Sequence, residues 1–355
     1  DRGGGAGLGG LSDSFVQLLG ARAVMALRLA MALPTSTAIL AASFEPQARG
    51  RALGLFASAI AVGRMTGPVL GGILLQLGGW RWLFWMDFIF WVGVSLAVLK
   101  IFRGPGERHL ETFDTYGALT LLISYPALLV ALTLGGSLGW LTAPVIGIFA
   151  LAALGMFGFL WIELHTVKPL VDMAIFREPL LTGALTIIVL SHLINHPIGL
   201  AAPLYLQTAL GASGVIAGLI LATLPLATAL ASPLGGWLAD RIDARTVNGF
   251  GVGVLGFGIA CYAALDSASQ LIIVSAVLAA IGIGIGLMTP ASQKIAFASV
   301  RQEDYGVLAA MLSSFSTAAG TIGIAITVAL MDAVGGRTLW HSPAAFAAAQ
   351  RFAFA

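Results

Sequence analysis

Four charged side chains lie inside long apolar stretches of the sequence, where they could exchange protons or bind a charged ligand. They are Arg22, Arg28, Arg64 and Asp87. A charge at the middle of a bilayer costs about 2.5–3.5 kcal/mol on insertion scales, so each of these side chains should face a polar interior rather than lipid. Arg22 and Asp87 lie at a similar depth in their stretches, which predicts an ion pair between them. Arg28 and Arg64 then need a counter-ion, either from a segment outside this sequence or from an anionic or amphiphilic ligand.

A second polar group lies in the apolar run from Pro179 to Ala239, which contains no Lys, Arg, Asp or Glu. Its members are His192, Asn195 and His196. The two histidines lie one helical turn apart, a spacing that can hold a metal ion, but the sequence places no third ligand beside them. Three interpretations stay open, namely a zinc site, a cavity-facing patch that binds a ligand or titrates near neutral pH, and hydrogen bonding between helices. The sequence predicts no resident metal and no cofactor.

The elements that position these residues are apolar segments long enough to cross a bilayer as helices of about 20 residues. Hydrophobic residues make up 58% of the chain and charged residues 10%, against about 25% charged residues in a soluble domain. The sequence therefore predicts an all-α integral membrane protein with ten spans. The net charge of +2 gives no reason to expect a nucleic-acid partner. The predicted spans are residues 14–43, 51–77, 82–102, 115–138, 141–162, 179–208, 213–238, 246–265, 270–294 and 305–332.

Basic residues concentrate in alternate connections between these spans, which by the positive-inside rule predicts that those connections face the cell interior. The other connections hold only Arg81 and Arg337. The predicted inner set is Arg49, Arg51, Lys100, Arg103, Arg108, Lys168, Arg177, Arg241, Arg245, Lys294 and Arg301.

Two long polar connections, 104–114 and 163–179, flank a pair of spans and predict linkers on either side of a helical hairpin. We therefore predict three parts. Residues 1–103 belong to a first helical bundle, 104–178 form the linkers and the central helix pair, and 179–355 form a second bundle.

Glycines at four-residue steps mark the second predicted span. Gly63, Gly67 and Gly71 share one face of a helix, which lets another helix approach closely. Pro68 removes a backbone donor and should bend the helix. Taken alone, this pattern predicts a packing and kinking device.

The pattern from Gly63 to Gly72, G-x-x-x-G-P-x-x-G-G, resembles the antiporter motif of the major facilitator superfamily. The segment Gly79 to Trp85 resembles the one that follows this motif in the fourteen-helix drug:proton antiporter branch. The later segment Gly236 to Arg245 is similar to the superfamily's cytoplasmic loop motif, G-x-L-A-D-R-x-G-x-R, with Asp243 where the motif has Gly. Its carboxylate and guanidinium groups are expected to cap and latch neighbouring helix ends. The matching residues are Gly63, Gly67, Pro68, Gly71 and Gly72 in the antiporter motif, and Gly236, Asp240, Arg241 and Arg245 in the loop motif.

The resemblance covers residues 12–333 and implies major-facilitator-type helical bundles, with about ten helices present of fourteen. The first two or three helices and the last one are expected to be missing. Arg22 aligns with the basic residue of the family motif R-x-x-Q-G, although Met25 and Ala26 stand where the motif has Gln and Gly. The resemblance implies a role for Arg22 in proton relay, with Asp87 as a second candidate. The alternative for Arg22 is an arginine whose guanidinium snorkels to the membrane surface.

The resemblance implies a monomeric, multi-pass transporter of the inner (plasma) membrane. It would export hydrophobic or amphiphilic small molecules, such as drugs, antiseptics and antibiotics, in exchange for protons by alternating access. No G-x-x-x-x-G-K-[ST] motif occurs, which argues against direct use of ATP, and no catalytic constellation occurs, so an enzyme is not expected. Two alternatives stay open, a transport-incompetent remnant and an exporter of an anionic metabolite or lipid-like molecule.

Overall fold

The computed structural model describes residues 15–101, 114–166, 177–335 and 343–354. All regular structure in these residues is helical, and ten spans are long and apolar enough to cross a membrane. This confirms the predicted all-α membrane fold. The predicted linkers lie largely outside the described residues. The elements are α2 (Phe15–Ser43), α3 (Arg49–Gly78), α4 (Trp80–Ile101), α5 (Thr115–Leu138), α6 (Ala143–His165), α7 (Pro179–Leu204), η2 (Tyr205–Ala209), α8 (Gly214–Leu221), α9 (Thr223–Arg241), α10 (Ala244–Ala263), α11 (Leu271–Ala298), η3 (Gln302–Asp304), α12 (Tyr305–Gly335) and α13 (Pro343–Phe354).

The chain divides into two compact units, each described here by itself. Unit 1 comprises residues 1–36 and 63–112, and unit 2 comprises residues 37–62 and 113–355. Helices α2 and α3 therefore belong to unit 1 at one end and to unit 2 at the other. The predicted boundaries after residues 103 and 178 do not follow this division and stay a prediction.

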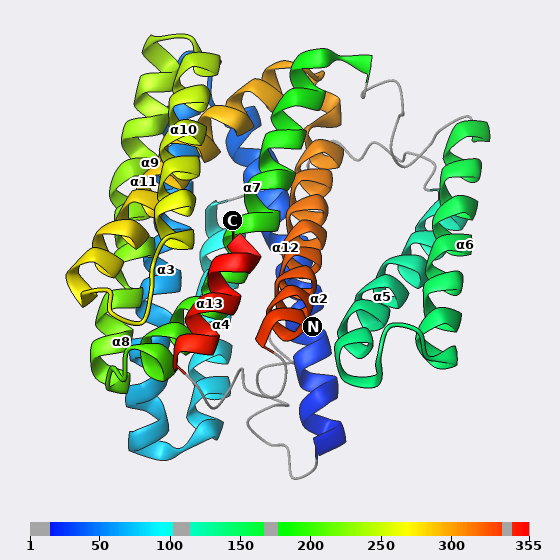
Figure 1. Cartoon of the computed structure of the whole chain (residues 1–355). Coiled ribbons are helices and arrows are strands. Elements are labelled where there is room, and N and C mark those ends of the chain that lie inside the picture. Colours follow the sequence, from blue (N-terminus) through cyan, green and yellow to red (C-terminus); the bar gives the residue numbers. More distant parts are fainter. Residues whose placement is uncertain (1–14, 102–113, 167–176, 336–342, 355) are drawn as a thin grey trace. The chain divides into compact units, whose positions relative to one another are not determined.

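Three helices of unit 2, α9, α10 and α11, lie side by side with α11 between the other two (Figure 1). Glycines at alternate positions of α11 make this contact close. A side chain at Gly282 would meet the Leu224 carbonyl of α9, and one at Gly284 would meet the backbone of Leu255 in α10. Small residues on a membrane helix allow such backbone approach, which dispersion and weak polar contacts then stabilise. The G-I-G-I-G segment of α11 thus gives it two packing faces.

The span predicted over residues 213–238 is confirmed as Gly214–Arg241, and the structure divides it into two consecutive helices. Helix α8 ends at Leu221 and α9 begins at Thr223. Pro225 has no N–H to donate to the Leu221 carbonyl, which interrupts the hydrogen-bond ladder at this point. At this break the Thr223 hydroxyl donates to the Ile220 carbonyl over 2.6 Å.

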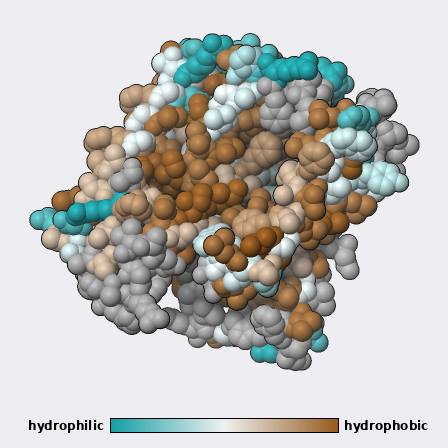
Figure 2. Space-filling view, turned by 45° about the vertical axis from the view of Figure 1, so that its right-hand side comes forward, coloured by the Kyte–Doolittle hydropathy of each residue, from teal (hydrophilic) through white to brown (hydrophobic). Residues whose placement is uncertain are grey.

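Large apolar side chains cover much of the surface of the described helices. Leu154 and Phe157 of α6 are 71% and 69% exposed, and Leu219 of α8 is 69% exposed. On the face that Figure 2 shows, hydrophobic residues form a broad continuous area. An apolar surface of this extent would aggregate in water, so it agrees with a protein whose surrounding solvent is lipid.

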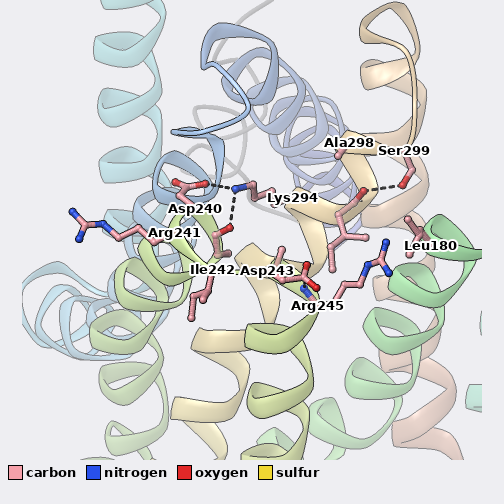
Figure 3. Close-up of a pocket in the computed structure, with 12 residues that line it drawn as sticks. Leu180, Asp240, Arg241, Ile242, Asp243, Arg245, Lys294, Ala298 and Ser299 are labelled. Atoms are coloured by element: carbon pink, nitrogen blue, oxygen red, sulfur yellow. Dashed lines mark hydrogen bonds and ion pairs between the residues drawn. The ribbon is translucent and has the colours of Figure 1, made fainter.

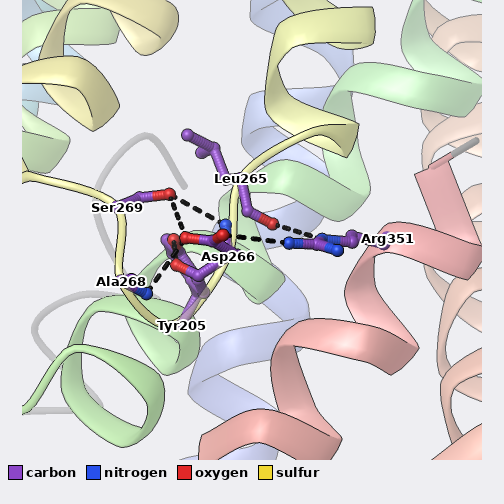
Figure 4. Close-up of polar contacts among 6 residues, drawn as sticks. All are labelled: Tyr205, Leu265, Asp266, Ala268, Ser269 and Arg351. Atoms are coloured by element: carbon purple, nitrogen blue, oxygen red, sulfur yellow. Dashed lines mark hydrogen bonds and ion pairs between the residues drawn. The ribbon is translucent and has the colours of Figure 1, made fainter.

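The turn between α10 and α11 is tied to α13 by a polar cluster (Figure 4). Arg351 of α13 lies 3.2 Å from Asp266 and also donates to the Leu265 carbonyl over 3.0 Å. The Tyr205 hydroxyl donates to the Asp266 carbonyl over 2.5 Å. Beneath this cluster Tyr205 and Tyr262 are fully buried. Helix α13, which is not predicted from the sequence, therefore docks through an ion pair, a hydrogen bond to a backbone carbonyl and an apolar core.

Candidate functional site

The carboxylate of Asp240, at the end of α9, accepts hydrogen bonds from the start of α3 and from α11. The backbone N–H of Gly50 donates to Oδ1 over 2.9 Å, and that of Arg51 donates to Oδ2 over 2.7 Å. The Lys294 ammonium lies 2.7 Å from Oδ1 and also donates to the Ala239 carbonyl over 2.8 Å. All these groups belong to unit 2. We call this arrangement the Asp240 latch.

Helix geometry explains why a carboxylate fits at this place. The first N–H groups of a helix have no partner within it, and its N-terminus carries a partial positive charge. Helix α3 begins at Arg49, so Gly50 and Arg51 supply two of these groups. The Asp240 side chain is only 8% exposed, a burial at which charge-assisted hydrogen bonds are stronger than at the surface.

Glycines allow α3 and α9 to approach closely enough for the latch to form. A side chain at Gly54 of α3 would collide with the Ser232 carbonyl of α9, and one at Gly236 would collide with the Gly50 carbonyl. A Cβ atom at Gly50 would lie 2.6 Å from both the Gly236 carbonyl oxygen and Asp240 Oδ1. Close backbone contact at these three glycines therefore sets the position of the carboxylate.

The cation that pairs with Asp240 is not one of the loop-motif arginines that are expected to latch neighbouring helix ends. The Arg241 guanidinium lies over the Trp237 ring, 4.3 Å from its centre. The ammonium of Lys294, rather than an arginine of the loop motif, neutralises Asp240. Lys294 is counted only for topology in the sequence analysis, because nothing in its local sequence connects it with a residue more than 50 positions earlier.

Asp243, which replaces the glycine of the loop motif, begins the next helix. Its side chain accepts a hydrogen bond from the Arg245 backbone N–H over 3.2 Å and caps α10. Its φ is −59° and that of Ile242 is −116°. Neither angle requires glycine, and aspartate is among the preferred N-cap residues. The turn therefore accommodates the substitution.

A pocket of about 370 Å³ opens beside the latch (Figure 3). Asp240 and Lys294 lie on one side of it, and Leu180 and Arg245 lie on the other. Its lining comprises Leu180, Ala239, Asp240, Arg241, Ile242, Asp243, Ala244, Arg245, Lys294, Ile295, Ala298 and Ser299. The pocket is thus lined by charged groups of both signs at the end of the helices that carries the basic connections.

In unit 1 the ion pair forms between Asp87 and Arg28. Arg28 Nη2 lies 2.9 Å from Oδ2 and 3.3 Å from Oδ1 of Asp87. Arg22 instead places its guanidinium over the Phe84 ring, 5.0 Å from its centre. The predicted Arg22–Asp87 pair is therefore wrong. The prediction assumes that α2 and α4 begin at the same level, whereas these contacts show that residues of α4 face residues of α2 further along the chain: Asp87 faces Arg28 rather than Arg22.

His192 and His196 lie on α7, which packs against α12. Their ring centres are 5.2 Å apart, and His192 Nδ1 lies 2.9 Å from the Ile188 carbonyl oxygen. A side chain at Gly320 of α12 would collide with the His196 ring. Asn195 is half-buried beside them. Within the described ranges no group of three or more His, Cys, Asp or Glu side chains is placed to hold a metal ion.

The antiporter-motif glycines lie in the part of α3 that belongs to unit 1. A Cβ at Gly71 would lie 3.8 Å from a methyl group of Leu83 in α4. The described part of this unit places no atom within 4 Å of an added Cβ at Gly63, Gly67 or Gly72. The close helix approach predicted at these glycines stays a prediction, as does a cavity-facing role for Arg64, whose side chain is exposed.

Comparison with known proteins identifies the family. The profile described as Major Facilitator Superfamily matches residues 3–194 and 184–350. The chain belongs to this superfamily. Membership confirms the prediction of a membrane transporter family rather than an enzyme.

Relatives within the superfamily include three bacterial proteins. The chain is 28% identical to multidrug resistance protein Stp of Mycobacterium tuberculosis, over 93% of this chain and 62% of that protein. It is 25% identical to multidrug transporter protein MdtP of Bacillus subtilis, over 93% and 61%. It is 26% identical to lincomycin resistance protein LmrB of Listeria monocytogenes, over 91% and 69%. The chain thus spans about six tenths of the length of the first two relatives.

Proposed function

We propose that the chain belongs to a secondary transporter of the inner (plasma) membrane that exports hydrophobic or amphiphilic small molecules in exchange for protons. Support comes from the superfamily match and from relatives named for multidrug and lincomycin resistance. Fourteen helices in the whole protein, of which this chain supplies about ten, and a monomeric state are parts of the same proposal.

The Asp240 latch is the observation that carries the mechanism. Alternating access requires the ends of helices at one membrane face to join and separate in turn. Asp240, at the end of α9, contacts the start of α3 and Lys294 of α11 through three polar contacts, and Lys294 makes a fourth with the Ala239 carbonyl. To open this end, the cycle must break those contacts and solvate Asp240 and Lys294. We propose that the latched arrangement is the state closed toward the cell interior.

Two groups of intramembrane residues complete the proposed cycle. Asp87, paired with Arg28, and Arg22 are the candidates for proton relay. The polar patch of His192, Asn195 and His196 is the candidate for contact with cargo in the second bundle. Gly63 to Gly72 would bring helices together at the interface between bundles, which prevents a leak of protons while the cavity faces the other side.

Ethidium accumulation in cells that lack their own drug exporters tests this proposal. Cells that express the chain should accumulate less ethidium than cells with an empty vector, and a protonophore should abolish the difference. Asp240→Asn should raise accumulation toward the vector level while the protein stays in the membrane. If the membrane contains the protein but accumulation equals that of the vector, the alternative of a transport-incompetent remnant is favoured instead.

A further inference from the structure

The Arg28 guanidinium has one side engaged and another side without a partner. Nη2 binds the Asp87 carboxylate, and the guanidinium carbon lies 4.3 Å from the centre of the Trp91 ring. Nε is buried, and the described part of the chain offers it no hydrogen-bond acceptor. The planar guanidinium carries five N–H donors in a fixed fork. A buried donor without an acceptor costs free energy, so a hydrogen-bond acceptor from a ligand would bind favourably at the Nε edge.

The described residues of unit 1 carry more positive than negative charge within the predicted spans. Apart from Arg81 and Lys100 near the two ends of α4, the described residues of unit 1 carry the guanidinium groups of Arg22, Arg28 and Arg64, and the carboxylate of Asp87. A low-dielectric surrounding penalises unpaired charge. The three cations against one anion favour binding of a further negative group, and they disfavour a cation.

We propose that Arg28 and Trp91 form a binding site for an amphiphilic organic anion with a carboxylate head and an apolar, aromatic body. The carboxylate would accept hydrogen bonds from the Nε edge of Arg28, a geometry that planar guanidinium groups favour. An aromatic body would lie beside Trp91, where offset stacking adds to apolar burial. This inference names a cargo class for the proposed exporter, and its meaning for transport rests on that function.

Substitution of Asp87 should change anion binding in the direction opposite to substitution of Arg28. Its carboxylate competes with the ligand for the Arg28 guanidinium and repels a second anion at the same place. Asp87→Asn keeps the shape and removes the negative charge, so it should tighten binding of an anion. If the cluster served only to hold α2 against α4, or bound a cation, the same substitution would weaken binding or leave it unchanged.

Three probes with one apolar body isolate the charge of the ligand. Pyrenebutyrate, pyrenebutanol and pyrenebutylamine are added to the purified chain in nanodiscs of phosphatidylcholine, and binding is followed by quenching of tryptophan fluorescence. The wild type should bind pyrenebutyrate about tenfold more tightly than pyrenebutanol, the size expected of one charge-assisted contact. Arg28→Gln should remove this preference, Arg28→Lys should keep part of it, and Asp87→Asn should raise the affinity for pyrenebutyrate severalfold. Lys100→Gln, which removes an exposed cation of the same unit, should behave as the wild type.

Equal binding of pyrenebutyrate and pyrenebutanol by the wild type, or a preference for pyrenebutylamine, would overturn the inference. Weaker binding of pyrenebutyrate by Asp87→Asn than by the wild type would also overturn it, provided that the variant elutes from size-exclusion chromatography in detergent as a single species. Efflux of ethidium and of pyrenebutyrate from cells separates this result from the function itself. Uncoupler-sensitive efflux of ethidium without a binding preference for the anion removes only the binding site, whereas a preference for the anion without efflux of either compound removes the proposed export.

Discussion

The backbone N–H of Gly50 lies 2.9 Å from Oδ1 of Asp240, although 190 residues separate the two positions. The contact joins the start of α3 to the last turn of α9, and Lys294 of α11 binds the same oxygen atom. One carboxylate thus holds three helices together at the end where basic connections gather. The stability of this end of unit 2 should therefore respond strongly to a change in that single charge.

Asp240→Asn is expected to lower the free energy of unfolding of the detergent-solubilised chain by about 1–3 kcal/mol. The amide keeps an acceptor for one backbone N–H group but leaves the half-buried Lys294 ammonium without its counter-charge. Thermal unfolding followed by circular dichroism measures the difference. In the transport assay the same variant should lose uncoupler-sensitive ethidium efflux.

Glu303→Gln is the matched control for that variant. Glu303 is also an acidic residue at this end and pairs with Arg301, but its side chain is 61% exposed. An exposed ion pair contributes little to stability, so Glu303→Gln should unfold within about 0.5 kcal/mol of the wild type. Equal effects of the two substitutions would contradict a special role for Asp240.

Gly54→Ala is expected to destabilise the chain by about 1–3 kcal/mol, the usual cost of overpacking. The added methyl group would meet the Ser232 carbonyl of α9 and push α3 away from it. Gly253→Ala in α10 is the control, because an added methyl group there meets no atom within 4 Å. Thermal unfolding should separate the two variants. If Gly54→Ala is as stable as Gly253→Ala, the helices do not approach at Gly54.

The membrane fold can be predicted from the sequence because composition determines it. Lipid demands long apolar helices whose backbone hydrogen bonds are all internal, and ten such segments stand out between polar connections. The break at Ala222 could also have been read from Pro225, which follows it by three residues. Helix α13 is a different case, since its twelve residues are too few to cross a bilayer.

The partners within the site could be predicted only in part. Asp240 stands in a recognisable motif, and its capping role follows from helix electrostatics. Lys294 and Arg28 acquire their acidic partners only when distant helices pack, and a depth count cannot fix which residues of two helices face each other. A close helix contact at Gly50 and Gly54 could have been predicted, because their four-residue spacing is the same small-residue pattern found at Gly63 and Gly67.

Zinc is expected to leave the stability of the chain unchanged. His192 and His196 supply two nitrogen ligands at most, whereas protein zinc sites use three or four protein ligands, and no group of three or more His, Cys, Asp or Glu side chains is placed to hold a metal ion within the described residues. Thermal unfolding with and without zinc tests this for the wild type and for the double variant His192→Asn, His196→Gln. A rise in melting temperature with zinc that the double variant loses would establish a metal site.

Cysteine labelling should place the turn at Gln47 and the start of α10 at Thr246 on the cytoplasmic side of the membrane and the turn at Ser267 on the other. The chain has one cysteine, Cys261, so Cys261→Ser provides a background for single cysteines at these exposed positions. An impermeant maleimide added to intact cells should label only Ser267→Cys, since basic connections stay inside. Labelling of Gln47→Cys without permeabilisation would reverse the predicted orientation.

Acid should loosen α13 before it affects the helices within the membrane. Hydrogen bonds from the Ser269 hydroxyl and from the Ala268 backbone hold the pKa of the Asp266 carboxyl below its usual value. A carboxyl group whose pKa is lowered in the folded state stabilises that state at any pH above the usual aspartate pKa of about 3.9. This contribution disappears as the pH falls through the lowered pKa. The ion pair with Arg351 is lost over the same range.

Hydrogen exchange of α13, measured by mass spectrometry between pH 7 and pH 3, tests this. Wild-type exchange, corrected for the intrinsic effect of pH, should accelerate only below about pH 3.9, the usual value for aspartate. Asp266→Asn cannot ionise, so its α13 should exchange faster at neutral pH and show no further acid-induced step. Arg351→Gln removes the cation but keeps the Ser269 hydrogen bond, so it should retain a smaller step. An identical step in the wild type and Asp266→Asn would assign the effect to another group.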